Sequence, residues 1–129
     1  KYMMAETSHY RWETITARRL YRDGLFGELV YCEAEYYHPG IGWANDGLSM
    51  RDGKRTWRWG YPPMLYPTHS TDFLVGVTRE RLVKVSCIGT KRPDDPGFTD
   101  NAYDNPFANG MAMFLTDKGH PFRCKGLSK

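Results

Sequence analysis

The spacing of hydrophobic residues in the first third of the chain predicts a helix followed by a long strand. An amphipathic pattern over Tyr10–Asp23 places Trp12 and Ile15 on one buried face. Gly24 is expected to end this helix, because glycine adopts the left-handed C-cap conformation at little cost. A pattern of period two then runs over Glu28–Tyr37 and predicts a strand.

The two faces of this predicted strand differ in character. One face is apolar and is expected to lie inward: Val30, Cys32, Ala34 and Tyr36. The other face mixes carboxylates with large side chains: Leu29, Tyr31, Glu33, Glu35 and Tyr37. Such a face suits contact with a second subunit, since burying a large apolar side chain there stabilises by roughly 1.5–3 kcal/mol.

The rest of the chain predicts shorter elements separated by two long loops. The expected elements are a strand at Tyr2–Ala5, a short strand at Arg55–Trp59 within the irregular segment His38–Met64, a helix at Pro67–Val77, a strand at Arg81–Ile88 with Val83, Val85 and Cys87 buried, a polar loop at Gly89–Asn105, and a hairpin of Met111–Leu115 with Pro121–Lys125. Late strands without helices between them favour antiparallel pairing. These elements predict an α+β fold, with a mostly antiparallel open sheet and helices packed on one face.

Composition restricts the chain to one globular domain. It has 129 residues, of which 40% are hydrophobic and 26% charged, which supports a core and argues against disorder. No run approaches the ~20 apolar residues of a membrane span, so we expect no membrane partner. The net charge of +3, without a basic block, argues against nucleic acid. Because the chain opens on Lys1 and not on methionine, we expect it to be part of a longer protein.

The three cysteines, Cys32, Cys87 and Cys124, are odd in number and widely spaced. Disulfide scaffolds and zinc sites use closer, paired spacings. We therefore expect free thiols, no bound metal and a reducing, cytoplasmic location.

Aromatic residues make up 15% of the chain, and three tryptophans fall in the irregular segment: Trp43, Trp57 and Trp59. Aromatic rings of this kind either stack on a sugar at a cleft or form a small core beneath a loop, and the sequence leaves both open.

Histidine is the residue type whose neutral ring accepts a proton near pH 7, and two of the four stand where sites often form. His69 opens the second predicted helix, where the partial positive charge of the helix N-terminus disfavours a cationic ring. The alternative is a histidine that caps a loop. His38 ends the long strand where it enters the loop, and its alternative is a surface histidine. The sequence has no Gly-x-Gly-x-x-Gly motif, so we expect no dinucleotide site in these residues.

Several motifs, taken in order, resemble one protein family. They are Tyr2-Met3-Met4-Ala5-Glu6, Tyr10, Arg22-Asp23-Gly24-Leu25-Phe26-Gly27-Glu28, Tyr36-Tyr37-His38, Trp57-Arg58 and Tyr66-Pro67-Thr68-His69-Ser70. Together they resemble the C-terminal domain of the Gfo/Idh/MocA oxidoreductases, the relatives of glucose–fructose oxidoreductase and inositol dehydrogenase. The resemblance covers nearly the whole chain. It implies that residues 1–129 form one substrate-binding and oligomerisation domain, with residues 1–7 like the last strand of a nucleotide-binding domain.

The resemblance also implies an activity. The enzyme would oxidise a sugar or polyol hydroxyl with NAD or NADP, which the full-length parent would bind through a Rossmann domain and these residues alone would not. His69 would be the catalytic base, and Tyr66 would share in handling the proton. The implied substrate-binding residues are Tyr10, Tyr36, Tyr37, His38, Trp57 and Arg58. Many members carry an aspartate four residues before the histidine, where this chain has Leu65, so the usual Asp/His arrangement is in question.

Two other functions remain open. The Met-Met-x-Glu and Tyr-Pro-Thr-His motifs are also similar to NAD-dependent glycosidases, which oxidise a sugar carbon transiently, eliminate the aglycone, add water and reduce the sugar again. The segment His38-Pro39-Gly40-Ile41 departs from that branch, which carries an Asp-Leu-Arg-like sequence there. The second alternative is a non-catalytic carbohydrate-binding or assembly module that uses the aromatic loop and the outer sheet face.

Overall fold

The computed structural model describes residues 1–3 and 5–127, and the chain divides into two compact units that are described separately. Unit 1 comprises residues 1–34, 68–86 and 112–124, and unit 2 comprises residues 35–67, 87–111 and 125 onward. Each of the four long strands contributes residues to both units.

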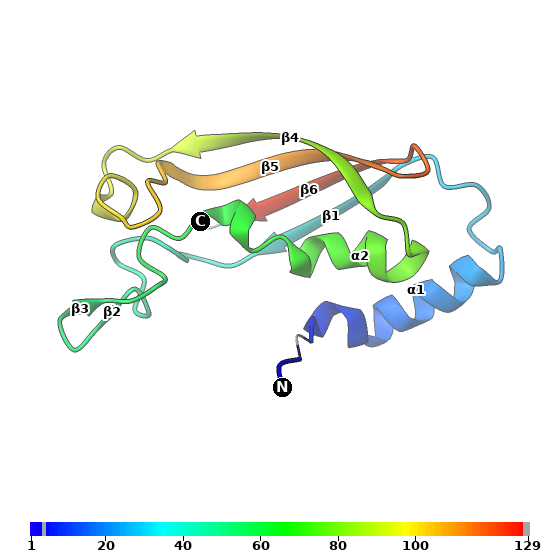
Figure 1. Ribbon diagram of the computed structural model, residues 1–129, viewed down its shortest axis with the longest axis horizontal. Helices are drawn as coiled ribbons and strands as arrows, with labels where there is room; N and C mark the ends of the chain where they lie inside the picture. Colours follow the sequence, from blue (N-terminus) through cyan, green and yellow to red (C-terminus); the bar gives the residue numbers. More distant parts are fainter. Residues whose placement is uncertain (4, 128–129) are drawn as a thin grey trace. The chain divides into compact units, whose positions relative to one another are not determined.

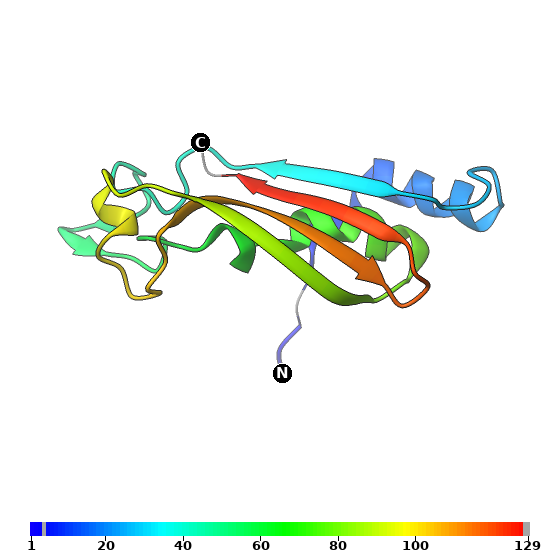
Figure 2. The same cartoon turned by 90° about the horizontal axis from the view of Figure 1, so that it is seen from above.

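The four long strands form one sheet in the order β1-β6-β5-β4 (Figure 2). They are β1 (Cys32–Tyr37), β4 (Leu82–Lys91), β5 (Phe107–Thr116) and β6 (Pro121–Leu127). The arrows in Figure 2 show β5 running opposite to both of its neighbours, whereas β1 runs in the same direction as β6. The predicted α+β fold with a mostly antiparallel sheet is confirmed, and the sheet is mixed because β1 joins it in parallel.

Unit 1 packs two helices on one face of its strands (Figure 1). These are α1 (Trp12–Arg22) and α2 (Thr68–Thr78), which lie against each other and against the 3₁₀ helix η1 (Thr7–Tyr10). Arg18 fastens them together, because its Nε donates to the Gly76 carbonyl at 2.5 Å and its Nη2 to the His9 carbonyl at 3.1 Å. The buried apolar residues of this unit are Leu74, Ala112, Phe122 and Cys124.

Unit 2 consists mainly of loops with short regular elements. They are β2 (Met50–Arg51), β3 (Lys54–Arg55), and the 3₁₀ helices η2 (Pro63–Leu65) and η3 (Pro96–Phe98). β2 and β3 form a small antiparallel ladder whose turn residues, Asp52 and Gly53, have φ angles of 49° and 72°. Glycine at the second of these positions allows the left-handed turn without a steric cost.

Two asparagines, of which Asn105 is buried, hold the loops of unit 2 in place. Asn105, 6% exposed, donates from Nδ2 to the carbonyls of Gly60 at 3.1 Å and Phe107 at 2.9 Å. Asn101 donates to the carbonyls of Gly97 at 3.0 Å and Asn105 at 2.9 Å. Gly60 has a φ of 69°, and a Cβ there would lie 2.2 Å from Asn101 Cβ. These contacts fix the course of a segment that has little regular structure of its own.

The strand predicted at Tyr2–Ala5 is wrong. Tyr2 and Met3 are 89% and 84% exposed and, like Ala5, are not in a strand, while Met4 lies outside the described residues. A strand needs a neighbouring strand for its backbone hydrogen bonds, and the sheet order provides none for these described residues.

The first helix is shorter at its start than predicted. The segment from Thr7 to Tyr10 forms η1, and α1 begins at Trp12, because Arg11 between them has an extended backbone. Trp12 is 73% exposed and is not on the buried face as predicted. Gly24, with a φ of 76°, follows the end of α1 in the predicted left-handed conformation.

Two of the predicted strands also need correction. β1 begins at Cys32 and not at Glu28, so Val30 is 74% exposed, although Cys32, Ala34 and Tyr36 do form the more buried side of β1. Of the strand predicted at Arg55–Trp59, only Arg55 lies in β3, because the chain turns away after it.

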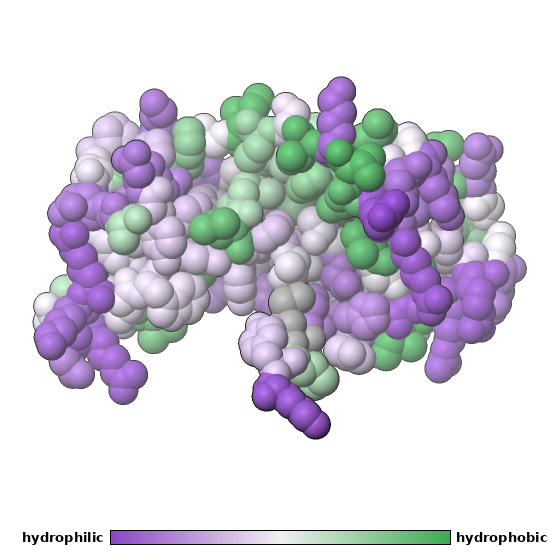
Figure 3. Space-filling view, viewed as in Figure 1, coloured by the Kyte–Doolittle hydropathy of each residue, from purple (hydrophilic) through white to green (hydrophobic). Residues whose placement is uncertain are grey.

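β4 is one of the two edge strands of the sheet, and it is more exposed than predicted. Val83 and Val85 are each 59% exposed, and Cys87 is also exposed, whereas burial was expected for all three. Hydrophobic side chains gather over this strand in Figure 3. An edge strand has a neighbour on only one side, so its alternating apolar residues are covered incompletely.

The second predicted helix and the final hairpin are confirmed. α2 begins one residue after Pro67, and β5 and β6 are joined by a turn in which Gly119 has a φ of 86°. Within the described part of the chain, no helix has the length and apolar character needed to cross a membrane. Nor do the described residues contain a group of three or more His, Cys, Asp or Glu side chains placed to hold a metal ion.

Candidate functional site

His69 lies in the first turn of α2, in unit 1, and its side chain is 14% exposed. Its Nδ1 lies 2.5 Å from Glu6 Oε1 and 3.4 Å from Ser8 Oγ. Glu6 is the N-cap of η1. Glu6 and His69 are 63 residues apart in sequence and meet because the two elements pack together. The Glu6 carboxylate therefore lies within hydrogen-bonding distance of Nδ1 of the predicted base.

Glu6 is surrounded by hydrogen-bond donors. Burial alone would raise its pKa, but hydrogen bonds from the Thr68 side chain, the Ser8 amide and His69 lower the pKa from 4.5 to about 2. The Ser8 amide donates to Oε1 at 2.9 Å. Glu6 is therefore ionised at neutral pH.

A second imidazole–carboxylate pair joins the same two elements. His9 Nδ1, in η1, lies 3.2 Å from Asp72 Oδ1, in α2. The other oxygen, Asp72 Oδ2, is buried and has no hydrogen-bond partner among the described residues. Gly76 leaves room for it, because a Cβ at that position would lie 2.5 Å from Oδ2. Tyr10, 68% exposed, packs edge-on against the His9 ring with 5.1 Å between the centroids, so Tyr10 stands at the surface beside this pair.

In unit 2 a group of aromatic rings surrounds Tyr61 and Tyr66. Tyr66 contacts the rings of Tyr36 and Tyr61 at centroid distances of 5.8 and 6.3 Å. Tyr61 also contacts Tyr103 at 5.6 Å and Trp57 at 5.2 Å. Burial, together with the neighbouring Tyr103 and Tyr66, raises the pKa of Tyr61. The group is a packed aromatic cluster with edge-to-face geometry.

His38 lies at the end of this cluster. Its ring centroid is 6.3 Å from that of Tyr36, and its Nδ1 is buried with no hydrogen-bond partner in the part of the chain that the structure describes. Tyr36, His38 and Tyr66 line a small cavity of about 10 Å³. That volume holds about one water molecule and is too small for a sugar ring.

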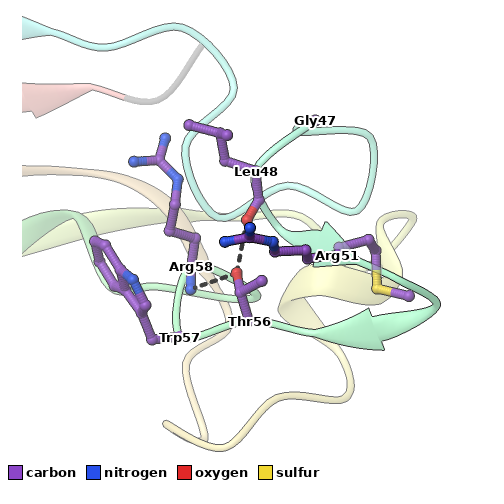
Figure 4. A pocket seen from close by; sticks show the side chains of 7 residues that line it. Gly47, Leu48, Arg51, Thr56, Trp57 and Arg58 are labelled. Carbon is purple, nitrogen blue, oxygen red and sulfur yellow. Dashed lines mark hydrogen bonds between the residues drawn. The ribbon is translucent and has the colours of Figure 1, made fainter.

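Trp57 and Arg58 line a separate, open groove of unit 2, with a volume of about 560 Å³ (Figure 4). Its remaining lining residues are Gly47, Leu48, Met50, Arg51 and Thr56. Arg58 Nε donates to Asp46 Oδ2 at 3.2 Å, and the guanidinium carbon lies 5.7 Å from the Trp57 ring centre. Arg58 Nη2 is buried and has no partner among the residues described. The groove has the volume of a small-molecule site, with an indole face and guanidinium donors at its wall.

Tyr37 faces away from the aromatic cluster. It lies on the exposed side of β1, 53% exposed, and its hydroxyl donates to Glu35. The Lys125 ammonium lies 5.6 Å from its ring centre. Tyr31 is placed similarly in unit 1, with its hydroxyl donating to Glu33 at 2.8 Å. These tyrosines belong to the outer side of the sheet.

The predicted site residues thus fall in several places. His69 sits where η1 meets α2, with Tyr10 at the surface of η1. Tyr36, His38 and Tyr66 share one small cavity, Trp57 and Arg58 share the open groove, and Tyr37 lies on the outer sheet face. Sequence reasoning missed the partner of His69, because nothing in the spacing of Glu6 connects it with a residue so distant in the chain.

The described residues do not fit a dinucleotide. A pyrophosphate site needs free amides at a glycine-rich turn that opens a helix. The segment Gly40–Gly42 comes closest to such a turn in sequence, but it is packed against other backbone. A Cβ on Gly42 would lie 3.0 Å from the Tyr61 backbone, and the Gly42 carbonyl accepts a hydrogen bond from the Gly60 amide at 2.8 Å. The start of α2 already faces a negative group, the Glu6 carboxylate, through Thr68 and His69.

Sequence comparison finds two related curated proteins, both from Shewanella. A glycosyl hydrolase family 109 protein of Shewanella amazonensis is 38% identical over 71 residues, and an alpha-N-acetylgalactosaminidase of Shewanella oneidensis is 38% identical over 69 residues. Each match covers 52% of this chain and 15% of the relative, so the chain spans a small part of their length. No family model matches the chain.

Structure comparison finds similar folds in larger enzymes. An aldose-aldose oxidoreductase of Caulobacter crescentus aligns with 98% of this chain at a TM-score of 0.66 and 19% identity. A myo-inositol dehydrogenase of Lactobacillus casei, solved with NAD(H) and myo-inositol, aligns with 93% at a TM-score of 0.60 and 10% identity. The alignments cover 35% and 31% of those chains. The fold expected from the sequence motifs is thereby confirmed.

Proposed function

Because the chain has the fold of the C-terminal domain of the Gfo/Idh/MocA oxidoreductases, we propose that it is the substrate-binding and oligomerisation domain of an enzyme that oxidises a sugar or polyol hydroxyl. The myo-inositol and NAD(H) bound to the Lactobacillus casei enzyme support a polyhydroxylated substrate and a nicotinamide cofactor, NAD or NADP. The parent protein binds that cofactor through other residues, because those described here do not fit a dinucleotide. The widely spaced cysteines Cys32 and Cys87, which form no disulfide, support a reducing, cytoplasmic location.

One observation carries the proposal: a largely buried imidazole in the first turn of a helix with a carboxylate on its Nδ1. Oxidation of an alcohol requires a base that takes the hydroxyl proton, and a neutral imidazole does this near pH 7. His69 is the base in this reaction. Tyr66, three residues earlier, shares in handling the proton.

The substrate-binding role falls to the other aromatic and basic side chains. Trp57 and Arg58, at the open groove, offer an aromatic face for a sugar ring and donors for its hydroxyl oxygens. The proposed binding residues also include Tyr10, Tyr36, Tyr37 and His38. Of these, the exposed Tyr10 is accessible to a ligand in the described structure, whereas Tyr36 and His38 line the small cavity.

The test is His69→Ala in the full-length protein that carries this chain. Turnover on a panel of sugars and polyols, followed by nicotinamide absorbance, should fall at least about a hundredfold, as loss of a general base does. Arg81→Ala is the control, because the Arg81 side chain is 82% exposed and has no assigned part in the chemistry. Unchanged turnover in His69→Ala would contradict the assignment, and sugar binding without any turnover in the wild type would favour a binding module.

A second candidate is an NAD-dependent glycosidase, favoured by the 38% identity with the two Shewanella proteins. The same assay with aryl glycosides separates the two reactions. A glycosidase releases the phenol without net change in nicotinamide absorbance, whereas a dehydrogenase changes the absorbance with the sugar alone.

We also propose that the domain forms a homo-oligomer through the outer face of its sheet. In unit 1 this face is free of helices (Figure 1), and it carries Met113, Leu115 and Tyr31 at 44%, 39% and 44% exposure. Met113→Lys should lower the sedimentation mass from oligomer to monomer, because a charge in an apolar interface is costly. Leu25→Lys, at a residue 70% exposed and outside the sheet, should leave the mass unchanged. A wild-type monomer would contradict the proposal.

A further inference from the structure

The charge on Glu6 decides which atom holds the proton between Glu6 and His69. Hydrogen bonds from Thr68 and Ser8 keep the carboxylate ionised at neutral pH, and a carboxylate only accepts hydrogen bonds. His69 Nδ1, 2.5 Å from Glu6 Oε1, must therefore carry the hydrogen and donate it. In a neutral imidazole the other nitrogen, Nε2, then holds the lone pair.

We infer that Glu6 is the positioning residue of His69: it holds the ring in the tautomer protonated on Nδ1, so that Nε2 is the proton acceptor. The choice of tautomer is a property of this chain alone. Its use in catalysis rests on the proposed function, in which His69 is the base.

The geometry around Glu6 fits this role because the carboxylate is itself fixed. Ser8, 1% exposed, donates its amide to the same Oε1 that faces the ring, at 2.9 Å. Thr68, the residue directly before His69, supplies a second anchor through its side chain. The first turn of α2 thus carries both Thr68, which holds the Glu6 carboxylate, and the His69 ring. The side chains of Glu6 and His69 are each only 14% exposed. Leu65, four residues before His69, has no carboxylate that could do this.

The neighbouring pair of His9 and Asp72 supplies a matched control. It joins the same two elements through an imidazole Nδ1 and a carboxylate, but at 3.2 Å and with His9 38% exposed. If Glu6 selects the tautomer of His69, that tautomer should change when Glu6 is replaced and should not change when Asp72 is replaced.

The experiment is a two-bond ¹H–¹⁵N correlation spectrum of the histidine rings in the ¹⁵N-labelled 129-residue chain at pH 8, above the ordinary pKa of an imidazole. His69→Gln identifies the signals of His69. In the wild type we expect the Nδ1-protonated pattern for His69. In Glu6→Ala we expect the majority of His69 to shift to the Nε2-protonated form, which free histidine prefers, while Asp72→Asn leaves His69 unchanged.

Two results would overturn the inference: a wild-type His69 protonated mainly on Nε2, or a folded Glu6→Ala with the wild-type pattern. The first needs no variant, so the test stands even if Glu6→Ala does not fold. Neither result depends on enzyme activity. A third result would separate the two proposals. If Glu6→Ala changes the His69 tautomer but His69→Ala keeps full turnover, Glu6 positions the ring as inferred, and the proposed function is contradicted.

Discussion

The two ends of α2 each hold a histidine against a glutamate, and the two pairs are built differently. At the N-terminal end, Glu6 and His69 are both 14% exposed and meet through one oxygen at 2.5 Å. Just beyond the C-terminal end, the Glu80 side chain is fully buried, and His120 Nδ1 lies 2.8 and 3.0 Å from its two oxygens.

The difference lies in what else supports each carboxylate. Glu6 accepts from the Ser8 amide and the Thr68 side chain in addition to His69, and the positive end of the α2 dipole lies beside it. Glu80 follows the negative end of the helix, and among the described residues its carboxylate is hydrogen-bonded by the His120 ring. Glu6 therefore has hydrogen-bond donors in addition to its histidine, whereas the Glu80 carboxylate relies on the His120 ring.

The Glu6–His69 pair is therefore suited to proton transfer, whereas the Glu80–His120 pair is suited to stabilising the fold. A base must be able to gain and lose a proton without loss of the fold, and the additional donors around Glu6 allow that. The Glu80 carboxylate has no such independence, because removing the His120 ring leaves it fully buried and unpaired.

The largest expected effect is therefore on stability at the C-terminal end. His120→Ala should lower the free energy of unfolding by about 4 kcal/mol, because it leaves the fully buried Glu80 carboxylate without its ring partner. Urea denaturation followed by circular dichroism measures the change. Glu33→Ala is the control: Glu33 pairs with Arg123 at 2.9 Å while 52% exposed, and the loss of a solvent-exposed pair costs far less than the loss of a buried one. Equal losses in the two variants would remove the distinction between the ends of α2.

The parts of the fold that sequence predicts well are those whose signals are local. The helix after Pro67, the hairpin turn at Gly119 and the end of α1 at Gly24 follow from backbone preferences of residues at the boundary itself. The α+β class follows from the order of those elements. None of these depends on knowing which distant segments touch.

The errors occur where burial depends on distant partners. Val83 and Val85 alternate as in a half-buried strand, but β4 is the sheet edge and they remain exposed. Position in a sheet is a tertiary property that alternation does not report. The same holds for the site: the helix position of His69 could be predicted, but its contact with Glu6 depends on η1 packing against α2.

The smaller expected effect is the dependence of stability on acid at the N-terminal end. The pKa of Glu6 falls from 4.5 to about 2 on folding, so its contribution is fully present above pH 4.5 and is lost as pH falls toward 2. That drop corresponds to on the order of 3 kcal/mol. In Glu6→Gln the group cannot ionise, so this part of the acid sensitivity should disappear.

The measurement is the difference in unfolding free energy between wild type and Glu6→Gln at pH 7 and at about pH 2.5. The other carboxylates with lowered pKa values, Glu33, Asp94, Asp100 and Asp117, are unchanged by the substitution and cancel in that difference. The wild-type advantage should shrink toward zero at the lower pH. An advantage that stays constant across this range would mean that the Glu6 carboxylate gains nothing from its donors on folding, and the contrast between the two ends of α2 would then rest on burial alone.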